Sequence, residues 1–179
     1  VTGVALDSAG NLYAAGWTEA LNFPILLAEQ AANAGGVDAF VVKVSPSGAG
    51  LIYATYFGGR GDDRAAAIAV DSSGEAYVTG ATSSSNFPLV AAVRPTLGGS
   101  KTAFVLKLNA VGNTLLFSTY LGGTAYDLGT AIALDAAGNA YIGGDTQSAN
   151  FPVLGGFQAA IGGGLAAFVT KLNWSGAYI

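Results

Sequence analysis

Short apolar segments separated by glycine-rich turns recur along the chain, and they predict β-strands. The first segment of each group is small and apolar, at residues 4–7, 67–71 and 131–135. It ends in an Asp-x-x-Gly-Asn/Glu turn, which suits a tight hairpin with glycine at positive φ. A second apolar segment follows directly, as in residues 76–80. We therefore expect the first two strands of each group to form a hairpin.

A longer loop leads to a second pair of strands. The third strand is expected at residues 40–44, 104–108 and 168–172, where apolar residues alternate with lysine as in a half-buried strand. A turn that contains glycine leads to the fourth strand, at residues 51–57 and 115–121, which precedes a Gly-Gly pair. At most one helical turn is expected, near residues 26–32 or 89–93. Each group thus predicts four antiparallel strands.

The groups are copies of one unit, because the same residues return at a spacing of 64 positions. The repeated columns include Asp7, Asp71 and Asp135; Tyr13, Tyr77 and Tyr141; Phe40, Phe104 and Phe168; Lys43, Lys107 and Lys171; and Asn-Phe-Pro at 22–24, 86–88 and 150–152. Four antiparallel strands in a unit of this length are typical of a β-propeller blade. The main rival, a β-solenoid, usually repeats every 20–30 residues or so. The sequence predicts an all-β fold with blade 1 at 1–63, blade 2 at 64–127 and blade 3 at 128–179.

Closure of the ring is an open question at this stage. Propellers typically have about four to eight blades, whereas this chain supplies about 2.8 units. Ile179 aligns with Leu115, so blade 3 is expected to lack its outer strand, and both end blades are expected to expose an apolar face. Three arrangements fit: a longer chain supplies the other blades, copies of the chain assemble, or the units form an open arc. The first strand of each blade suits the innermost position, where only small side chains such as those of Ala66, Ala67 and Ala69 fit.

The repeated columns resemble the SBBP repeat, a bacterial β-propeller repeat family of large secreted or surface proteins. The resemblance rests on Thr-Tyr-Phe-Gly-Gly-Arg-Gly-Asp-Asp at 55–63, Ala-Ile-Ala-Val-Asp at 67–71, Gly-Ala-Thr at 80–82, Thr-Tyr-Leu-Gly-Gly at 119–123 and the Asn-Phe-Pro tripeptides. The first two strands also resemble the NHL blade pattern. Tyr126 in the place of Asp62, and Glu75 in the place of the usual asparagine, depart from the family pattern. The resemblance implies a propeller fold and an extracellular or cell-surface setting, and it implies no catalytic residues.

Composition narrows the classes of function. Only 10% of the residues are charged, against about 25% in a typical soluble domain. The net charge of −4 and the scattered basic residues disfavour a nucleic-acid partner. Histidine, cysteine and methionine are absent, which excludes disulfides, Ser/His catalysis and zinc, copper or haem sites that need these ligands. No apolar run reaches the ~20 residues of a membrane-spanning helix. We expect no enzyme, no catalytic residues and no cofactor.

Several motifs could carry chemistry, and each also has a structural explanation. Arg60-Gly61-Asp62 spells a cell-adhesion tripeptide, but it also fits a turn between blades. Asp62 and Asp63 could bind Ca²⁺ through their oxygens, although the dense Asp-x-Asp spacing of a calcium loop is lacking. Asn173-Trp-Ser175 is a glycosylation sequon that matters only in a secretory host.

The repeated residues likewise have both a functional and a structural explanation. Asp7, Asp71 and Asp135 either point into a central channel or stabilise the hairpins. The lysines Lys43, Lys107 and Lys171 are expected in solvent or beside a carboxylate. The tripeptides either form an aromatic surface for sugars or peptides, or the asparagine caps a turn while Phe23, Phe87 and Phe151 fill the space between blades.

These observations predict a non-enzymatic structural or interaction module of a secreted or cell-surface bacterial protein. One alternative is a self-assembling extracellular fibre or sheath subunit completed by a neighbouring chain. Another is a carbohydrate- or peptide-binding propeller. The expected partners are further blades of a longer chain or copies of this chain, with a glycan or a protein as a further ligand.

Overall fold

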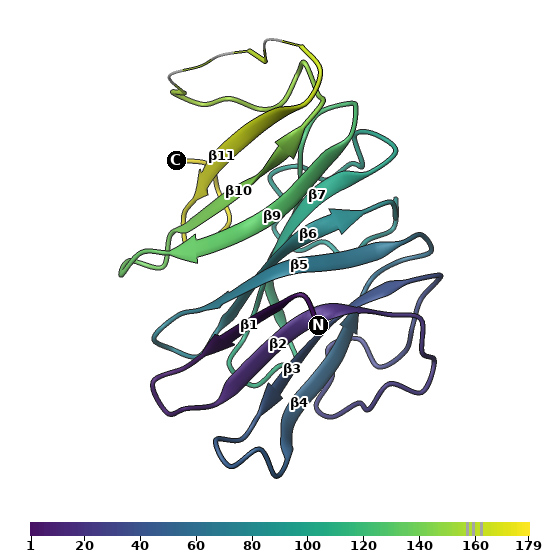
Figure 1. Cartoon of the computed structure of the whole chain (residues 1–179), viewed down its shortest axis with the longest axis vertical. Coiled ribbons are helices and arrows are strands. Elements are labelled where there is room, and N and C mark those ends of the chain that lie inside the picture. The colour runs from purple at the N-terminus through teal and green to yellow at the C-terminus, as the bar shows by residue number, and fades with distance from the viewer. Residues whose placement is uncertain (157, 159, 162) are drawn as a thin grey trace.

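The computed structural model is a row of three antiparallel sheets, shown one above another in Figure 1. It describes residues 1–156, 158, 160–161 and 163–179. Blade 1 consists of β1 (Gly3–Leu6), β2 (Leu12–Thr18), β3 (Asp38–Val44) and β4 (Leu51–Phe57). Blade 2 consists of β5 (Asp63–Val70), β6 (Ala76–Thr82), β7 (Thr102–Leu108) and β8 (Leu115–Leu121). Blade 3 consists of β9 (Asp127–Leu134), β10 (Ala140–Thr146) and β11 (Ala166–Leu172).

Each sheet follows the chain order, so every strand pairs with the strands before and after it. The first strands β1, β5 and β9 pack against one another from blade to blade, which places them on the inner side as predicted. The all-β fold with propeller blades is therefore confirmed, and the three sheets are not closed into a ring (Figure 1). No helix occurs in the described part of the chain, so none there could span a bilayer.

Several predicted strand boundaries needed correction, although β4 and β8 have the expected bounds. The third strands β3, β7 and β11 begin two residues ahead of the predicted 40, 104 and 168. The larger differences are in β5 and β9, which begin at Asp63 and Asp127, ahead of the predicted 67 and 131. A register shift in each pair, at Ala65/Ala67 in β5 and opposite Gly143/Gly144 in β9, lets the strand bend and continue. Both strands start one residue before the blade boundaries taken from the repeat.

The prediction of a helical turn near residues 26–32 or 89–93 is wrong. These segments instead lie along the outer strand of their blade, through isolated bridges from Leu26 to Ala54 and from Val90 to Ser118. The Leu26 amide donates to the Ala54 carbonyl at 3.1 Å, and the Ala54 amide donates back at 2.8 Å. An outer strand leaves backbone groups unpaired, and the loop satisfies them and shields the edge.

The core consists of two apolar layers, one between blades 1 and 2 and one between blades 2 and 3. Val41 and Val105 occupy the same repeat position on β3 and β7 and are 1% and 0% exposed, whereas the equivalent Val169 on β11 is 79% exposed. On the far side of blade 1, Val4 and Leu6 are 62% and 68% exposed. Apolar faces at both end blades were expected and are present.

Candidate functional site

The turn after the first strand of each blade is organised by its aspartate. In blade 1, Asp7 Oδ1 accepts hydrogen bonds from the amides of Ala9 (3.0 Å) and Asn11 (2.9 Å). Its Oδ2 atom accepts from Tyr13 Oη at 3.2 Å and lies 3.5 Å from Lys43 Nζ. Hydrogen bonds, foremost from the Asn11 side chain, lower the pKa of Asp7 to about 2. The aspartate thus stabilises the hairpin, and the lysine pairs with this carboxylate.

The same clusters connect neighbouring blades. Tyr13 Oη lies 3.1 Å from the carbonyl oxygen of Gly74 in the blade 2 turn, and Tyr77 Oη donates to the Gly138 carbonyl of blade 3 at 3.2 Å. Both tyrosines are fully buried, whereas Tyr141 of blade 3 is 37% exposed. Its hydroxyl donates to Asp135 within its own blade, at 3.3 Å. The tyrosine column therefore builds the contact between blades, and blade 3 presents the same group to solvent.

Each linker between blades ends at a buried aspartate, the first residue of the next strand, whose structural role the sequence did not reveal. Asp63 Oδ2 accepts from the Gly59 amide (2.7 Å) and Ser84 Oγ (2.7 Å), while Oδ1 accepts from Thr82 Oγ1. Asp127 repeats this arrangement with Gly123, Thr146 and Ser148. The clue was a shared column of Asp, Thr and Ser at matching positions. In blades 2 and 3 the carboxylate fastens the first strand to the end of the second strand.

A second buried aspartate is particular to blade 1. Asp38 Oδ2 accepts from the Ala34 amide (2.7 Å) and Gln30 Nε2 (3.1 Å), while Oδ1 has no hydrogen-bond partner among the described residues. Burial, and to a smaller degree the neighbouring Asp63 carboxylate, raise the pKa of Asp38. Blade 2 has Thr102 at this position, so the repeat itself does not require a carboxylate here.

The Arg60-Gly61-Asp62 tripeptide is part of the linker before β5. The Arg60 amide donates to Asn86 Oδ1 at 2.9 Å, and the Gly61 amide donates to Ser84 Oγ at 2.8 Å. The Asp62 carboxylate lies 3.7 Å from Arg64. These contacts support the structural turn over a free adhesion loop. Among the described residues, no group of three or more acidic side chains could hold a metal ion together.

The Asn-Phe-Pro loops pack on the third and fourth strands of their own blades. The Phe87 ring lies 4.7 Å from Phe104 and 6.2 Å from Tyr120, measured between ring centres. Tyr120 Oη donates to the Ser84 carbonyl at 2.6 Å. The loop folds back over the third and fourth strands of its own blade. Phe87 also belongs to the apolar layer between blades 1 and 2, and Phe151 packs against the layer between blades 2 and 3, as predicted for residues that fill the space between blades. Glycan or peptide binding by these loops stays a prediction.

The sequon residue Asn173 also has a local role. Its Oδ1 atom accepts hydrogen bonds from the Ser175 amide (3.0 Å), Ser175 Oγ (2.8 Å) and the Ala177 amide (2.9 Å). The side chain thus closes the turn that follows β11.

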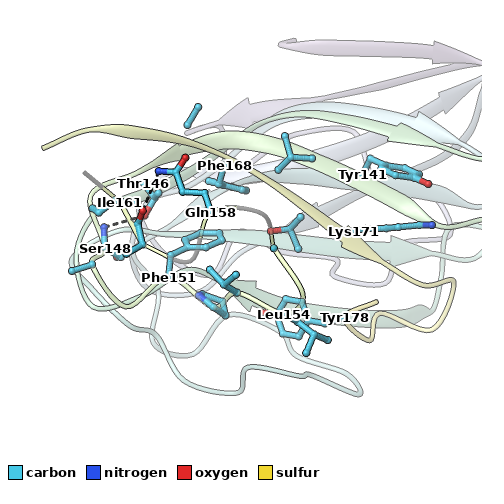
Figure 2. Close-up of a pocket in the computed structure, with 18 of the residues that line it drawn as sticks. Tyr141, Thr146, Ser148, Phe151, Leu154, Gln158, Ile161, Phe168, Lys171 and Tyr178 are labelled. Carbon is cyan, nitrogen blue, oxygen red and sulfur yellow. Dashed lines mark hydrogen bonds between the residues drawn. The ribbon is translucent and has the colours of Figure 1, made fainter. Parts of the chain in front are cut away.

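A groove of about 500 Å³ runs along the outer side of blade 3 (Figure 2). One wall is β11 and the other is the loop that follows the third Asn-Phe-Pro tripeptide. The lining residues include Ser148, Phe151, Leu154, Phe168 and Tyr178. In blades 1 and 2 the equivalent place is filled by β4 and β8. Among the described residues, blade 3 has no strand in this position.

The fold and these contacts define a protein built from β-propeller blades, the class that serves as an interaction or structural module. A family model, the SBBP beta-propeller repeat, matches residues 52–88 and 116–152. The chain therefore carries SBBP β-propeller repeats in these two segments. Each match begins in an outer strand and ends at the tripeptide of the following blade, so that it spans the linker with its buried aspartate. A comparison with curated proteins gave no match.

Proposed function

We propose that the chain is a non-enzymatic interaction module of a secreted or cell-surface bacterial protein, and that it binds further propeller blades through its end faces. The observation that carries this proposal is the blade contact itself. Each contact joins a face of one blade to a face of the next, and it occurs twice within the chain. The first kind of face is exposed on blade 3, and the second kind is exposed on blade 1.

The exposed face of blade 3 has the chemistry of a face that is covered elsewhere in the chain. Tyr77 and Val105 of blade 2 are fully buried against blade 3. The equivalent Tyr141 and Val169 are 37% and 79% exposed. Identical residue types at identical repeat positions suit the same kind of neighbour, which is another blade.

The exposed face of blade 1 complements it. Val4 and Leu6 occupy the repeat positions of Ile68 and Val70, which pack into the layer between blades 1 and 2. Burying one large aliphatic side chain contributes about 1.5–3 kcal/mol. Two faces with several such residues therefore favour head-to-tail association of blades.

Three further observations support a non-enzymatic role outside the cell. The carboxylates of Asp7, Asp63 and Asp127 hold turns and linkers together, so they are committed to structure. The low fraction of charged residues, together with abundant glycine, alanine, serine and threonine, suits an extracellular protein. The resemblance to repeats of secreted proteins adds to this. Protease treatment of intact host cells, followed by an antibody against the chain, would test the location.

The solution mass of the purified chain, measured by size-exclusion chromatography with light scattering over a range of concentrations, tests the binding of blades. We expect a dimer or a longer assembly. Val169→Glu or Leu6→Glu should shift the mass to that of the monomer, because each places a charge on one of the two faces. Leu21→Glu is the control, since Leu21 is 82% exposed in a loop. A wild-type chain that stays monomeric at every concentration would contradict the proposal.

A further inference from the structure

The outer strand of a complete blade is paired on both of its edges. In blade 2, β8 pairs with β7, with Thr119 opposite Val105. On its other edge, the Val90 amide donates to the Ser118 carbonyl at 3.2 Å, and the Ser118 amide donates back at 2.8 Å. In blade 1, Leu26 and Ala54 form the same pair of bonds. The outer strand therefore lies in a slot between the third strand and the loop.

Blade 3 has both walls of this slot. Its third strand β11 carries Val169 in the position of Val105, and its loop carries Leu154 in the position of Val90. The Ile179 amide donates to the Lys171 carbonyl at 3.2 Å, so the backbone groups of Lys171 point to the open edge. Because alternate residues of a strand point the same way, the amide and carbonyl of Val169 point there too. The open edge can pair with an incoming strand.

In the described part of blade 3, the aromatic lining of the slot has one ring fewer than in blades 1 and 2. In blade 1, Phe23 lies 4.8 Å from Phe40 and 5.3 Å from Tyr56, measured between ring centres, and the Tyr56 hydroxyl donates to the Ala20 carbonyl at 2.6 Å. Blade 3 has the first two rings, Phe151 and Phe168, whose centres are 4.4 Å apart.

In blades 1 and 2 the third ring, a tyrosine, comes from the outer strand. Ser148 is the equivalent of Ser84, whose carbonyl accepts the tyrosine hydroxyl in blade 2. Figure 2 shows Phe151 and Phe168 facing each other in the groove, with Leu154 and Tyr178 beside them. The groove of blade 3 therefore lies where blade 2 has an outer strand that carries a tyrosine.

We propose that this groove binds an extended strand with the outer-strand sequence type of this repeat: Thr-Tyr, then leucine or phenylalanine, then Gly-Gly. The tyrosine ring packs on Phe151 and its hydroxyl donates to the Ser148 carbonyl. The strand backbone pairs with β11 on one side and with the loop at Leu154 on the other. This inference rests on the proposed function, but it concerns an edge of blade 3 rather than the two faces.

A labelled peptide with the sequence of residues 115–123 and a solubilising Lys-Lys tail is the probe. Titration with the intact chain, followed by fluorescence anisotropy, should show saturable binding. The same peptide with Tyr120→Phe should bind roughly 2- to 10-fold more weakly, because one hydrogen bond is lost. A scrambled peptide should not bind.

Two variants of the chain test whether the peptide binds in the groove. Leu154→Pro removes the amide that donates to the incoming strand, so it should weaken binding roughly 2- to 10-fold relative to Leu154→Ala, which keeps the amide. A chain extended after Ile179 by the sequence of residues 116–123 fills the groove from within, and it should lose binding of the free peptide.

The outcomes separate this inference from the proposed function. Leu6→Glu should abolish association through the faces and leave peptide affinity unchanged. The inference is overturned if the peptide does not bind, if the scrambled peptide binds equally well, or if the extended chain binds as tightly as the original. None of these results changes the association through the faces, which the solution mass reports.

Discussion

The hydroxyl of Tyr77, on β6 of blade 2, donates a 3.2 Å hydrogen bond to the carbonyl oxygen of Gly138, in the turn that follows β9 of blade 3. Lys107 lies over the same tyrosine ring, with its Nζ atom 4.7 Å from the ring centre, and pairs with Glu75 at 2.6 Å. The contact joins a strand of one blade to a turn of the next, and Tyr13 and Gly74 make the same contact one blade earlier.

This hydrogen bond can be tested with two tyrosines of the same column. Tyr77→Phe removes a buried bond between blades and should lower the free energy of unfolding by about 0.5–1.5 kcal/mol. Tyr141→Phe is the control, because its partly exposed hydroxyl bonds only to Asp135 of its own blade among the described residues. Urea unfolding followed by tryptophan fluorescence measures both. Equal losses in the two variants would show that the contact between blades contributes nothing.

The two neighbouring aspartates of the linker should differ strongly. Asp63→Ala removes the acceptor of three buried donors, and we expect a loss of about 2–4 kcal/mol in the free energy of unfolding. Asp62→Ala should cost less than about 0.5 kcal/mol, because its pair with Arg64 is partly exposed. Thermal unfolding monitored by circular dichroism compares the two. A similar loss in both variants would contradict the role of Asp63.

Two glycines of one repeat column separate backbone strain from packing between blades. Gly48 and Gly112 both have positive φ, at 72° and 85°. A Cβ atom at Gly48 meets nothing within 4 Å, whereas at Gly112 it would collide with the Tyr53 ring of blade 1. Gly48→Ala should therefore cost about 1 kcal/mol, and Gly112→Ala should cost about 1–3 kcal/mol more. Equal costs in denaturant unfolding would mean that the ring moves away freely.

The buried Asp38 carboxylate should make stability depend on pH. Its pKa in the folded chain is raised above the unfolded value, so the folded state holds the proton more tightly. The stabilising contribution is complete below the unfolded pKa, about 3.9, and is lost as the pH rises through the folded pKa.

Asp38→Asn removes this titration and leaves a neutral side chain of the same shape in the buried site. Relative to wild type, the variant should gain about 1–3 kcal/mol at pH 7 and much less at pH 4. Urea unfolding at both pH values measures the difference. A variant that is less stable than wild type at pH 7 would refute the explanation.

Local patterns in the sequence determined the blades, their number and most of their strands. The bounds of β4 and β8 follow from short apolar runs between turns, and the role of Asp7 follows from the turn chemistry around it, because both depend on residues close in sequence. The bulges that extend β5 and β9 depend on pairing with the next strand, and the loop bridge at Leu26 depends on the free edge of β4. Neither leaves a local signal.

Only the tertiary structure decided which of the repeated residues are buried and which are available for binding. Val105 and Val169 have the same side chain at the same position of the same repeat, yet one is fully buried and the other is 79% exposed. The carboxylate of Asp63 and the lysines beside Tyr13 and Tyr77 were likewise placed by contacts that cross from one strand or blade to another. Burial is a property of what packs against a residue, and in a repeat protein that neighbour lies a whole unit away in the sequence.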